Sequence, residues 1–168
     1  MNKNTFVAIL MGSDSDLPVM QSTINTLKSL DIKCEVKISS AHRTPVDTKQ
    51  YVIDAESRGC VVFIAAAGLA AHLAGTLAAY TLKPVIGVPM DGGPLKGMDA
   101  LLSTVQMPGG VPVATVAIGK AGAKNAAYLA AQIIGVADEA VATRLKADRE
   151  ANAEAVRAKD AELQKTLS

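Results

Sequence analysis

Hydrophobic residues along the chain gather in short, nearly continuous runs that are separated by segments with helical periodicity. Continuous runs rich in valine and isoleucine are typical of strands that are buried on both faces. This pattern predicts five strands, of which the second is the more alternating one, at residues 6–11, 32–38, 61–67, 84–88 and 111–118. Helical patterns occur between and after them, at residues 17–30, 45–57, 70–80, 98–106 and 122–134.

The regular alternation of strand and helix indicates a parallel sheet with right-handed crossovers. We therefore predict an α/β fold, a three-layer α/β/α sandwich around a doubly wound parallel sheet. In such sheets, ligands bind beyond the carboxyl ends of the strands. The length of 168 residues predicts a single compact unit.

The last 33 residues differ in composition from the rest of the chain. They hold 13 charged side chains, whereas the preceding 135 residues hold only 20. We predict a catalytic α/β domain over residues 1–135 and a helical extension over residues 136–168. The extension either packs on a neighbouring subunit or is solvated and frays. The low charge density of residues 1–135 predicts that the protein self-associates, because it leaves much of the surface apolar.

Composition narrows the classes of partner and location. Seventeen basic and 16 acidic side chains leave a net charge of +1 without a basic cluster, which argues against nucleic acid and membrane partners. No apolar run reaches the roughly 18 residues of a spanning helix, and no secretory signal is recognisable, so we expect a cytoplasmic protein. Cys34 and Cys60 are far apart and lack a CxxC partner, which predicts two buried, reduced thiols.

The first loop with candidate chemistry follows the first predicted strand. Gly12 permits a tight turn, and Ser13, Ser15 and Asp16 then lead into a helix with Pro18 in its first turn. Free N–H groups and the positive end of the helix dipole suit such a loop to holding a phosphate. The same residues are equally suited to capping the helix, and the loop alone leaves both interpretations open.

The second loop changes that balance. His42 and Arg43 lie just before Thr44 and Pro45, which read as the N-cap and first residue of a helix. The guanidinium of arginine suits phosphate oxygens, and histidine as a residue type moves protons near neutral pH. A histidine and arginine side by side are often a surface pair without function. The chain has only two histidines, however, and the other, His72, also follows a predicted strand, which favours function.

The sequence lacks the motifs of several common enzyme classes. The sequence contains no GxGxxG after the first strand, no GxxxxGK[ST], no HExxH and no GxSxG. The residues therefore predict an enzyme that needs no cofactor or metal, or a binding module, that takes a small phosphorylated ligand.

Five motifs in one order resemble a known family, the bacterial-type 5-(carboxyamino)imidazole ribonucleotide mutases of de novo purine biosynthesis. The motifs are MGSDSD at 11–16, SAHRTP at 40–45, GLAAHL at 68–73, PVIGVP at 84–89 and VQMPGGVPVAT at 105–115. The sequence departs from the family at Ala74, where proline is usual, and at residues 91–94. The resemblance implies the flavodoxin-like form of the predicted sandwich, and the helix-forming residues of 136–168 predict an extended C-terminal helix.

The resemblance also implies a reaction, in which a carboxylate moves from the exocyclic amine of an imidazole ribonucleotide to the neighbouring ring carbon, through carbon dioxide and without a cofactor or metal. The implied catalytic residues are His42, which carries the proton, and His72, which orients the substrate or polarises the carboxylate. The implied substrate-binding residues are Ser13 and Arg43 for the phosphate, Asp16 for the ribose, and Ser40, Gly68 and Leu73 around them. The family resemblance further implies a homo-oligomer, as an octamer.

Two other functions stay open at this point. One is direct carboxylation of the unmodified aminoimidazole ribonucleotide by carbon dioxide, the reaction of the animal-type relatives. The other is a flavodoxin-like module that senses a nucleotide and catalyses nothing. The SAHR and AAHL segments favour the mutase over the first, and the absence of a receiver-type acidic pocket with its lysine argues against the second.

Overall fold

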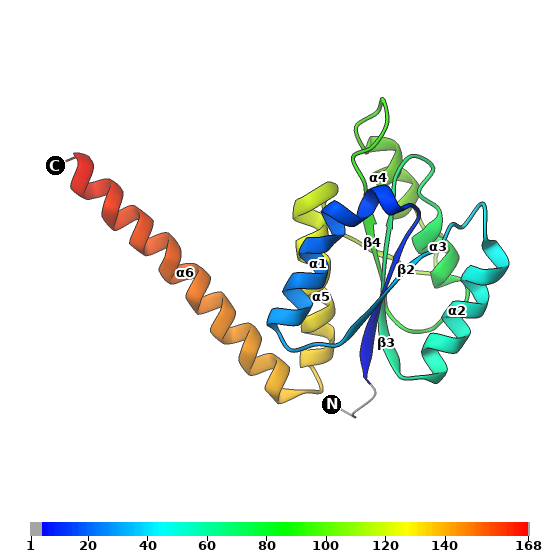
Figure 1. Ribbon diagram of the computed structural model, residues 1–168, viewed down its shortest axis with the longest axis horizontal. Coiled ribbons are helices and arrows are strands. Elements are labelled where there is room, and N and C mark those ends of the chain that lie inside the picture. The colour runs from blue at the N-terminus through cyan, green and yellow to red at the C-terminus, as the bar shows by residue number, and fades with distance from the viewer. Residues whose placement is uncertain (1–4, 168) are drawn as a thin grey trace.

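The computed structural model describes residues 5–167 of the chain. Its strands, shown in Figure 1, are β1 (Phe6–Met11), β2 (Cys34–Ile38), β3 (Cys60–Ala67), β4 (Val85–Pro89) and β5 (Ala114–Thr115). Its helices are α1 (Leu17–Ser29), α2 (Pro45–Ser57), α3 (Leu73–Ala78), α4 (Met98–Val105), α5 (Gly119–Gly135) and α6 (Glu139–Leu167), with a short 3-10 turn, η1 (Asp14–Asp16), before α1.

The strands form one parallel sheet with the order β2-β1-β3-β4-β5. This is the flavodoxin-like order, and the predicted fold class is confirmed. The chain reverses its direction of travel across the sheet between β1 and β3. The crevice outside the carboxyl ends of these two strands is therefore the expected position of a ligand.

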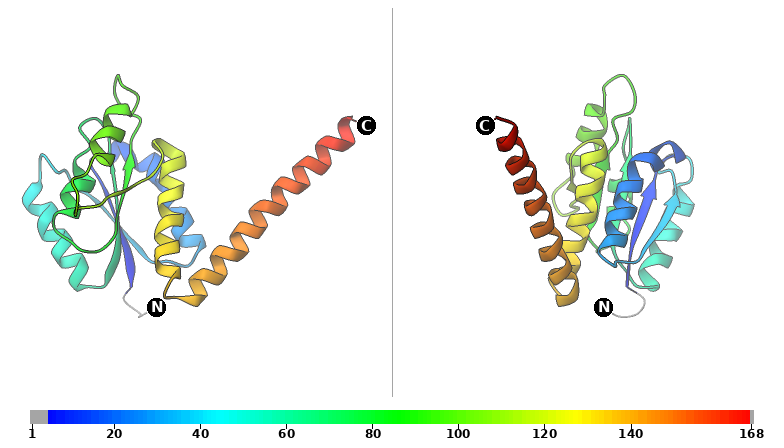
Figure 2. Two further views of the ribbon diagram at one scale, coloured as in Figure 1. Left: turned by 180° about the vertical axis from the view of Figure 1, so that it is seen from behind. Right: turned by 60° about the vertical axis from the view of Figure 1, so that its left-hand side comes forward.

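Two hydrophobic cores flank the sheet, because residues of the central strands point alternately to its two faces. On one face, Val7 and Ile9 of β1 pack with α1 and the alanine-rich side of α5. The two helices lie side by side in Figures 1 and 2, and the buried Thr23 hydroxyl of α1 donates to the Ala123 carbonyl of α5 at 2.7 Å. On the other face, Ala8 and Leu10 pack with α2 and α3.

Three predicted elements differ by more than two residues in length from those observed. The fifth strand has two residues instead of residues 111–118, because Val111 donates to Pro108 in a turn and Pro112 has no N–H for a ladder. Helix α3 begins at Leu73 instead of residue 70, since Leu69 has a left-handed φ of 55°. Helix α5 begins at Gly119, three residues earlier than predicted.

The C-terminal segment forms one helix of 29 residues, α6. Its first turns pack on the chain's own body: Val141 is buried, Arg144 Nε donates to the Leu30 carbonyl at 2.7 Å, and Tyr128 donates to Asp148 at 2.8 Å. The rest projects away from the body (Figure 2). The accessible surface of 9345 Å² accordingly exceeds the roughly 7,800 Å² expected for a compact monomer of this mass.

Both cysteines are free thiols, as predicted, but only Cys60 is buried. Cys34 is half-buried, so the prediction of two buried thiols is wrong for it. The first residue of edge strand β2 has a neighbouring strand on one side only, and this leaves the Cys34 side chain partly open. Within residues 5–167, no helix has the length and apolar character to cross a membrane.

Candidate active site

The loops that follow β1, β2 and β3 meet at the carboxyl edge of the sheet. Because β1 lies between β2 and β3, its loop has the other two as neighbours. The loops are held to the sheet by backbone hydrogen bonds, since Gly12 N donates to the Ala66 carbonyl at 3.0 Å and Ser39 N to the Met11 carbonyl at 2.8 Å. The structure thus brings together the segments that carry Ser13, His42 and His72.

The first loop caps a helix and also presents hydroxyl groups. Ser13 is the N-cap of η1, and its Oγ accepts a hydrogen bond from Ser15 N at 3.3 Å. The Ser15 hydroxyl donates to the same Ser13 oxygen at 3.0 Å, and the Ser13 hydroxyl donates to Asp14 Oδ1 at 3.1 Å. The Ser13 side chain therefore caps η1, but Asp16, the N-cap residue of α1, makes no side-chain capping hydrogen bond, so the capping interpretation is wrong for α1 itself. Ser15 is nevertheless exposed and Ser13 half-exposed, so their hydroxyls can reach a ligand.

Arg43 lies across the first and second loops. Its backbone N donates to Ser40 Oγ at 3.1 Å, its Nε to the same oxygen at 3.5 Å, and its Nη2 to the Gly12 carbonyl at 3.2 Å. Among the ion pairs of residues 5–167, none involves Arg43. The guanidinium is therefore an exposed cation beside Ser13, held in place by neutral oxygens.

Thr44 closes the second loop in a way that the sequence did not indicate. It is the N-cap residue of α2, as predicted, but its side chain makes no capping hydrogen bond to the helix. Ser40 N instead donates to Thr44 Oγ1 at 3.0 Å, and this hydroxyl donates to the Ser40 carbonyl at 3.2 Å. The spacing of four residues between Ser40 and Thr44 is the only signal that could have suggested this.

The two histidines of the chain contact each other. His42 Nε2 lies 2.8 Å from His72 Nδ1, and the ring centroids are 4.8 Å apart at an interplanar angle of 77°. In this hydrogen bond one ring must donate and the other must accept. It leaves Nδ1 of His42 and Nε2 of His72 for other partners. Both side chains are exposed.

Asp16 is the half-buried acid of the site. Burial raises the pKa of its carboxyl group, the negative charge of Asp14 adds to this, and a hydrogen bond from the Ser13 backbone opposes it. A carboxylate whose ionised form is disfavoured by its surroundings is an acceptor that the hydroxyls of a ligand can satisfy.

In the third loop, Gly68 allows the backbone to come close to the loop after β4. A β-carbon on Gly68 would lie 3.4 Å from Cβ of Met90, so the loops after β3 and β4 pass near each other there. Leu73, the other predicted binding residue of this loop, is buried in the core with α2 and α3. Its side chain does not point to the histidines' solvent-exposed surface, so any contact with a ligand falls to its backbone.

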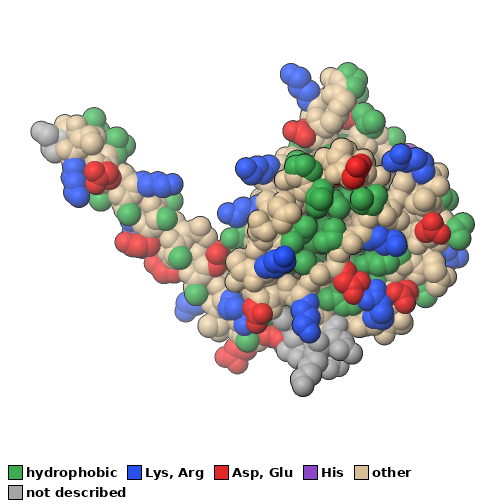
Figure 3. Space-filling model, in the orientation of Figure 1, with side chains coloured by type: hydrophobic (Ala, Val, Ile, Leu, Met, Phe, Trp, Pro, Cys, Tyr) green, Lys and Arg blue, Asp and Glu red, His purple; other side chains and the backbone are tan. Residues whose placement is uncertain are grey.

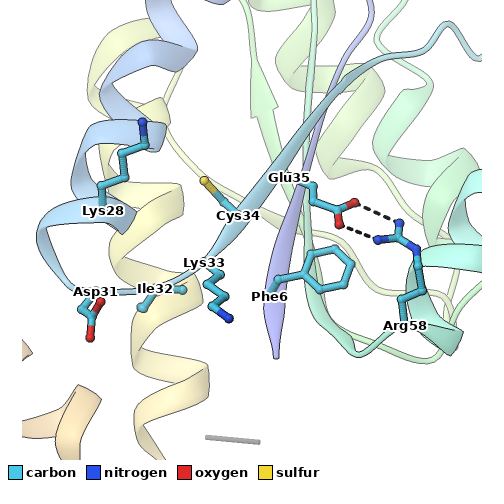
Figure 4. A pocket seen from close by; sticks show the side chains of 8 residues that line it. All are labelled: Phe6, Lys28, Asp31, Ile32, Lys33, Cys34, Glu35 and Arg58. Carbon is cyan, nitrogen blue, oxygen red and sulfur yellow. Dashed lines mark hydrogen bonds and ion pairs between the residues drawn. The ribbon is translucent and has the colours of Figure 1, made fainter. Parts of the chain in front are cut away.

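A separate groove of about 760 Å³ lies at the opposite, amino edge of the sheet. Figure 4 shows Phe6, the first residue of β1, beside Arg58 and Glu35, with Cys34 and Lys28 on the other side of β2. Arg58 pairs with Glu35 and donates through Nε to Asp54 at 2.7 Å. Its charge is thus neutralised within the chain, which indicates a structural role.

The surface of the molecule adds no cluster of metal ligands. Residues 5–167 contain no group of three or more His, Cys, Asp or Glu side chains placed to hold an ion.

Figure 3 shows hydrophobic side chains gathered on the body of the molecule, whereas charged side chains follow one another along the projecting α6.

Comparisons with known proteins agree with these features. Residues 6–155 match the AIR carboxylase family. The N5-carboxyaminoimidazole ribonucleotide mutase of Mycobacterium leprae is 50% identical over 165 residues, which are 98% of this chain and 95% of that protein. The mutase of Bacillus subtilis is 54% identical over 144 residues, 86% of this chain and 89% of that protein.

A crystal structure gives the same result for the fold. Treponema denticola PurE superposes with a TM-score of 0.85 at 30% sequence identity, over 95% of this chain and 98% of that chain. The resemblance noted in the five motifs is confirmed, and the chain belongs to the AIR carboxylase family.

Proposed function

We propose that this chain is a mutase that converts 5-carboxyaminoimidazole ribonucleotide into 4-carboxy-5-aminoimidazole ribonucleotide in purine biosynthesis, with His42 as the proton carrier. The relatives named above carry this activity in their names and match nearly the whole chain. The observation that carries the proposal is the hydrogen-bonded pair of His42 and His72 beside the unpaired cation of Arg43.

The phosphate of the substrate binds between the first and second loops. Arg43 offers a planar guanidinium, and Ser13 and Ser15 offer hydroxyls at the start of a helix, where backbone N–H groups and the helix dipole favour an anion. Ser40 holds the guanidinium through its hydroxyl. Asp16, at the end of the same turn, accepts hydrogen bonds from the ribose.

The proton balance of the reaction needs one group that both gives and takes a proton. When the carbamate nitrogen is protonated, its bond to the carboxyl carbon breaks, carbon dioxide leaves and the amine forms. The neighbouring ring carbon then bonds to carbon dioxide and afterwards loses its own hydrogen as a proton. A single imidazole returns to its starting state after both steps.

The hydrogen bond to His72 orients His42 for this proton transfer. When His42 is an imidazolium, its Nε2–H donates to the unprotonated Nδ1 of His72, which leaves the Nδ1–H of His42 for the substrate. His72 therefore orients His42, because the hydrogen bond to Nε2 leaves Nδ1 as the ring nitrogen of His42 that can face the substrate.

Carbon dioxide is small and neutral, so the site has to confine it between the two steps. The alanines and glycine of residues 68–71 can form a close wall, but His42 and His72 are exposed in the single chain. Cover from a second copy fits the apolar surface: Met98, Leu102 and Val105 are exposed along α4 at a spacing that places them on one face. The proposal includes carbon dioxide as the intermediate. It also includes the homo-octamer that the family resemblance implies and the cytoplasmic location that the sequence predicts.

The test is a turnover assay with two substrates. We expect the protein to convert 5-carboxyaminoimidazole ribonucleotide in the absence of added bicarbonate, ATP and metal. Aminoimidazole ribonucleotide with carbon dioxide serves as the second substrate, and faster turnover of it would replace the mutase with the carboxylase. Binding of either nucleotide without turnover would support a sensor module instead.

Assembly is tested separately, by sedimentation. We expect an oligomer at micromolar concentration, and a weaker one when the chain ends at Glu150, because residues 151–168 include Val156, Leu163 and Leu167, which are exposed in the single chain. The first turns of α6, which pack on the chain's own body, stay in this variant. A monomer of 17.3 kDa for the full chain would contradict the expectation.

A further inference from the structure

The loop that carries His72 contains a residue in a conformation that its side chain disfavours. Leu69 has a φ of 55°, in the left-handed region that favours glycine. Its side chain is 53% exposed, so burial of the leucine does not explain why the backbone is held there. Such conformations persist where surrounding contacts impose them, and they gather at functional sites.

The contact that involves Leu69 lies in the next loop along the sheet. A β-carbon on Gly93 would be 2.4 Å from Cδ2 of Leu69 and 3.7 Å from its Cγ. The leucine side chain therefore sits directly on the position that any side chain at residue 93 would occupy. Gly93 itself has a φ of 79°, so both residues of the contact are left-handed.

Close contacts constrain both ends of residues 90–97, the segment that carries Gly93. Met90 N donates to the Ala67 carbonyl at 2.9 Å, and Gly68 approaches Met90 so closely that a β-carbon there would be 3.4 Å from Met90 Cβ. At the other end of the loop, Gly97 leaves no room for a β-carbon, which would lie 2.7 Å from Ile118 and 2.9 Å from the Met90 carbonyl oxygen. Gly93 is thus part of a constrained turn.

His72 follows Leu69 by three residues. The His72 backbone N donates to the Ala70 carbonyl at 2.9 Å, and Thr76 N donates to the His72 carbonyl at 2.9 Å, which joins the loop to α3. The path of residues 69–72 therefore sets where the His72 ring lies. That ring meets His42 at 2.8 Å.

We propose that Leu69 is a positioning residue, whose side chain, seated on Gly93, holds the 68–72 loop in the path that brings His72 Nδ1 to His42 Nε2. The catalytic consequence rests on the proposed function, whereas the effect on the two rings does not. Leu69 acts on the reaction only through His72. Gly93 is the residue against which the Leu69 side chain packs. The proposal predicts that the histidine pair separates when either member of the contact changes.

The first measurement follows the two rings directly. With only two histidines in the chain, a protein labelled with [15N]histidine gives four ring-nitrogen signals, which variants of His42 and His72 assign. We expect a hydrogen-bonded N–H signal between the rings in the unaltered protein and its loss in Leu69→Gly. Glycine tolerates a φ of 55°, so this variant keeps the backbone conformation accessible and its fold intact.

The second measurement is kinetic. Leu69→Gly should lower kcat by roughly 10- to 100-fold, the effect of an ångström-scale displacement of a catalytic group, with little change in KM. Leu69→Asn, which also tolerates the left-handed region, should behave alike because it lacks the branched apolar end. Gly92→Ala is the matched control: no atom lies within 4 Å of its added β-carbon, so both the N–H signal and kcat should stay unchanged.

A double variant separates the contact from backbone strain at residue 93. Gly93→Ala should lower kcat in the unaltered protein by displacing Leu69, and should have no further effect on kcat in the Leu69→Gly background, where nothing is left to displace. Its destabilisation from the φ of 79° should persist in both backgrounds. Equal losses of kcat in the two backgrounds would overturn the proposed contact.

The two readouts distinguish this inference from the function on which its kinetic part rests. Retention of the N–H signal in Leu69→Gly overturns the positioning role, whatever the change in kcat. Loss of the signal with unaltered kcat upholds the positioning of the rings and contradicts the proposed use of the pair in catalysis. Loss of the signal in a protein without mutase activity upholds the positioning role alone.

Discussion

The carboxyl groups at the two edges of the sheet differ in their partners and in the direction of their pKa shifts. At the amino edge, Arg58 bonds to Glu35 and holds the pKa of that carboxyl group below its ordinary value. At the carboxyl edge, Asp16 has no cation bonded to it within residues 5–167, and burial raises its pKa. One carboxylate is paired with a cation of its own chain, whereas the other has only the backbone hydrogen bond at Ser13 to oppose the effect of burial.

The two arginines show the same contrast. Arg58 bonds to two carboxylates, Glu35 and Asp54, and its guanidinium lies 5.2 Å from the ring centroid of Phe6. Within the described residues 5–167, Arg43 bonds only to neutral oxygens, those of Ser40 and Gly12. A charge that is neutralised by its own chain stabilises the fold, whereas a charge held without a counterion is available to a ligand.

The largest expected effect is on turnover at the carboxyl edge. His42→Asn should keep the fold and nucleotide binding but lower kcat by roughly 10² to 10⁴, the usual range for loss of a general acid and base. Asparagine removes the titratable ring at similar size. Turnover of 5-carboxyaminoimidazole ribonucleotide is measured alongside calorimetric binding of the product, which does not need the proton transfer.

A control at the amino edge sharpens this test. Cys34→Ala changes a half-buried side chain that lines the groove with Arg58, and it should leave kcat unaltered. A loss of turnover comparable with that of His42→Asn would break the distinction between the two edges. Near-normal turnover in His42→Asn would remove His42 from the mechanism.

The next effect compares the two arginines as ligand contacts. Arg43→Ala should weaken nucleotide binding by about 10- to 150-fold, since a charge-assisted hydrogen bond contributes about 1.5 to 3 kcal/mol. Arg58→Ala should lower the melting temperature and leave nucleotide affinity unchanged, because its partners are Glu35 and Asp54. Calorimetric titration and thermal unfolding of both variants measure the two quantities.

Removal of the phosphate from the ligand identifies what Arg43 binds. The corresponding nucleoside should bind the unaltered protein and Arg43→Ala with the same affinity, so that the losses from arginine and phosphate do not add. Equal weakening of nucleotide and nucleoside by Arg43→Ala would mean that Arg43 only holds the loops together, through Ser40 and Gly12.

Much of this arrangement follows from the sequence. Continuous apolar runs such as residues 6–11 predict buried parallel strands, and a parallel sheet brings the ends of its strands to one edge. That is why His42 and His72, 30 residues apart, could be expected near each other. The hydrophobic pattern therefore predicts that the loops carrying the two histidines lie at the same edge of the sheet.

Other features depend on contacts that no local pattern encodes. The left-handed Leu69 and its seat on Gly93 arise from two loops that follow different strands. The bond from Arg43 to the Gly12 carbonyl uses a backbone atom, which every residue type has. The spacing of Cys34 and Cys60 and the lack of a CxxC partner predict two buried thiols, but the place of Cys34 at the start of an edge strand leaves it half-exposed.

The smallest effects are on stability, and their signs follow from the two carboxyl groups. Asp16 has a folded-state pKa above its ordinary value of 3.8, so the folded protein loses stability as pH rises from that value through the raised one. Glu35 has a folded-state pKa below its ordinary value of 4.5, so its contribution is fully present above 4.5 and is lost as pH falls through the lowered value.

Asp16→Asn and Glu35→Gln should therefore change the melting temperature in opposite directions at neutral pH. Asp16→Asn removes an ionised group that burial disfavours, and should raise it while weakening nucleotide binding; Glu35→Gln removes an ionised group that Arg58 stabilises, and should lower it. The Asp16→Asn difference should shrink as the pH falls through the raised pKa of Asp16 towards 3.8, and the Glu35→Gln difference should shrink as the pH falls from 4.5 through the lowered pKa of Glu35. Thermal unfolding from pH 3 to pH 7 measures both curves. Destabilisation by Asp16→Asn at neutral pH would show that the chain itself satisfies this carboxylate, and the contrast between the two edges would then not hold for their acids.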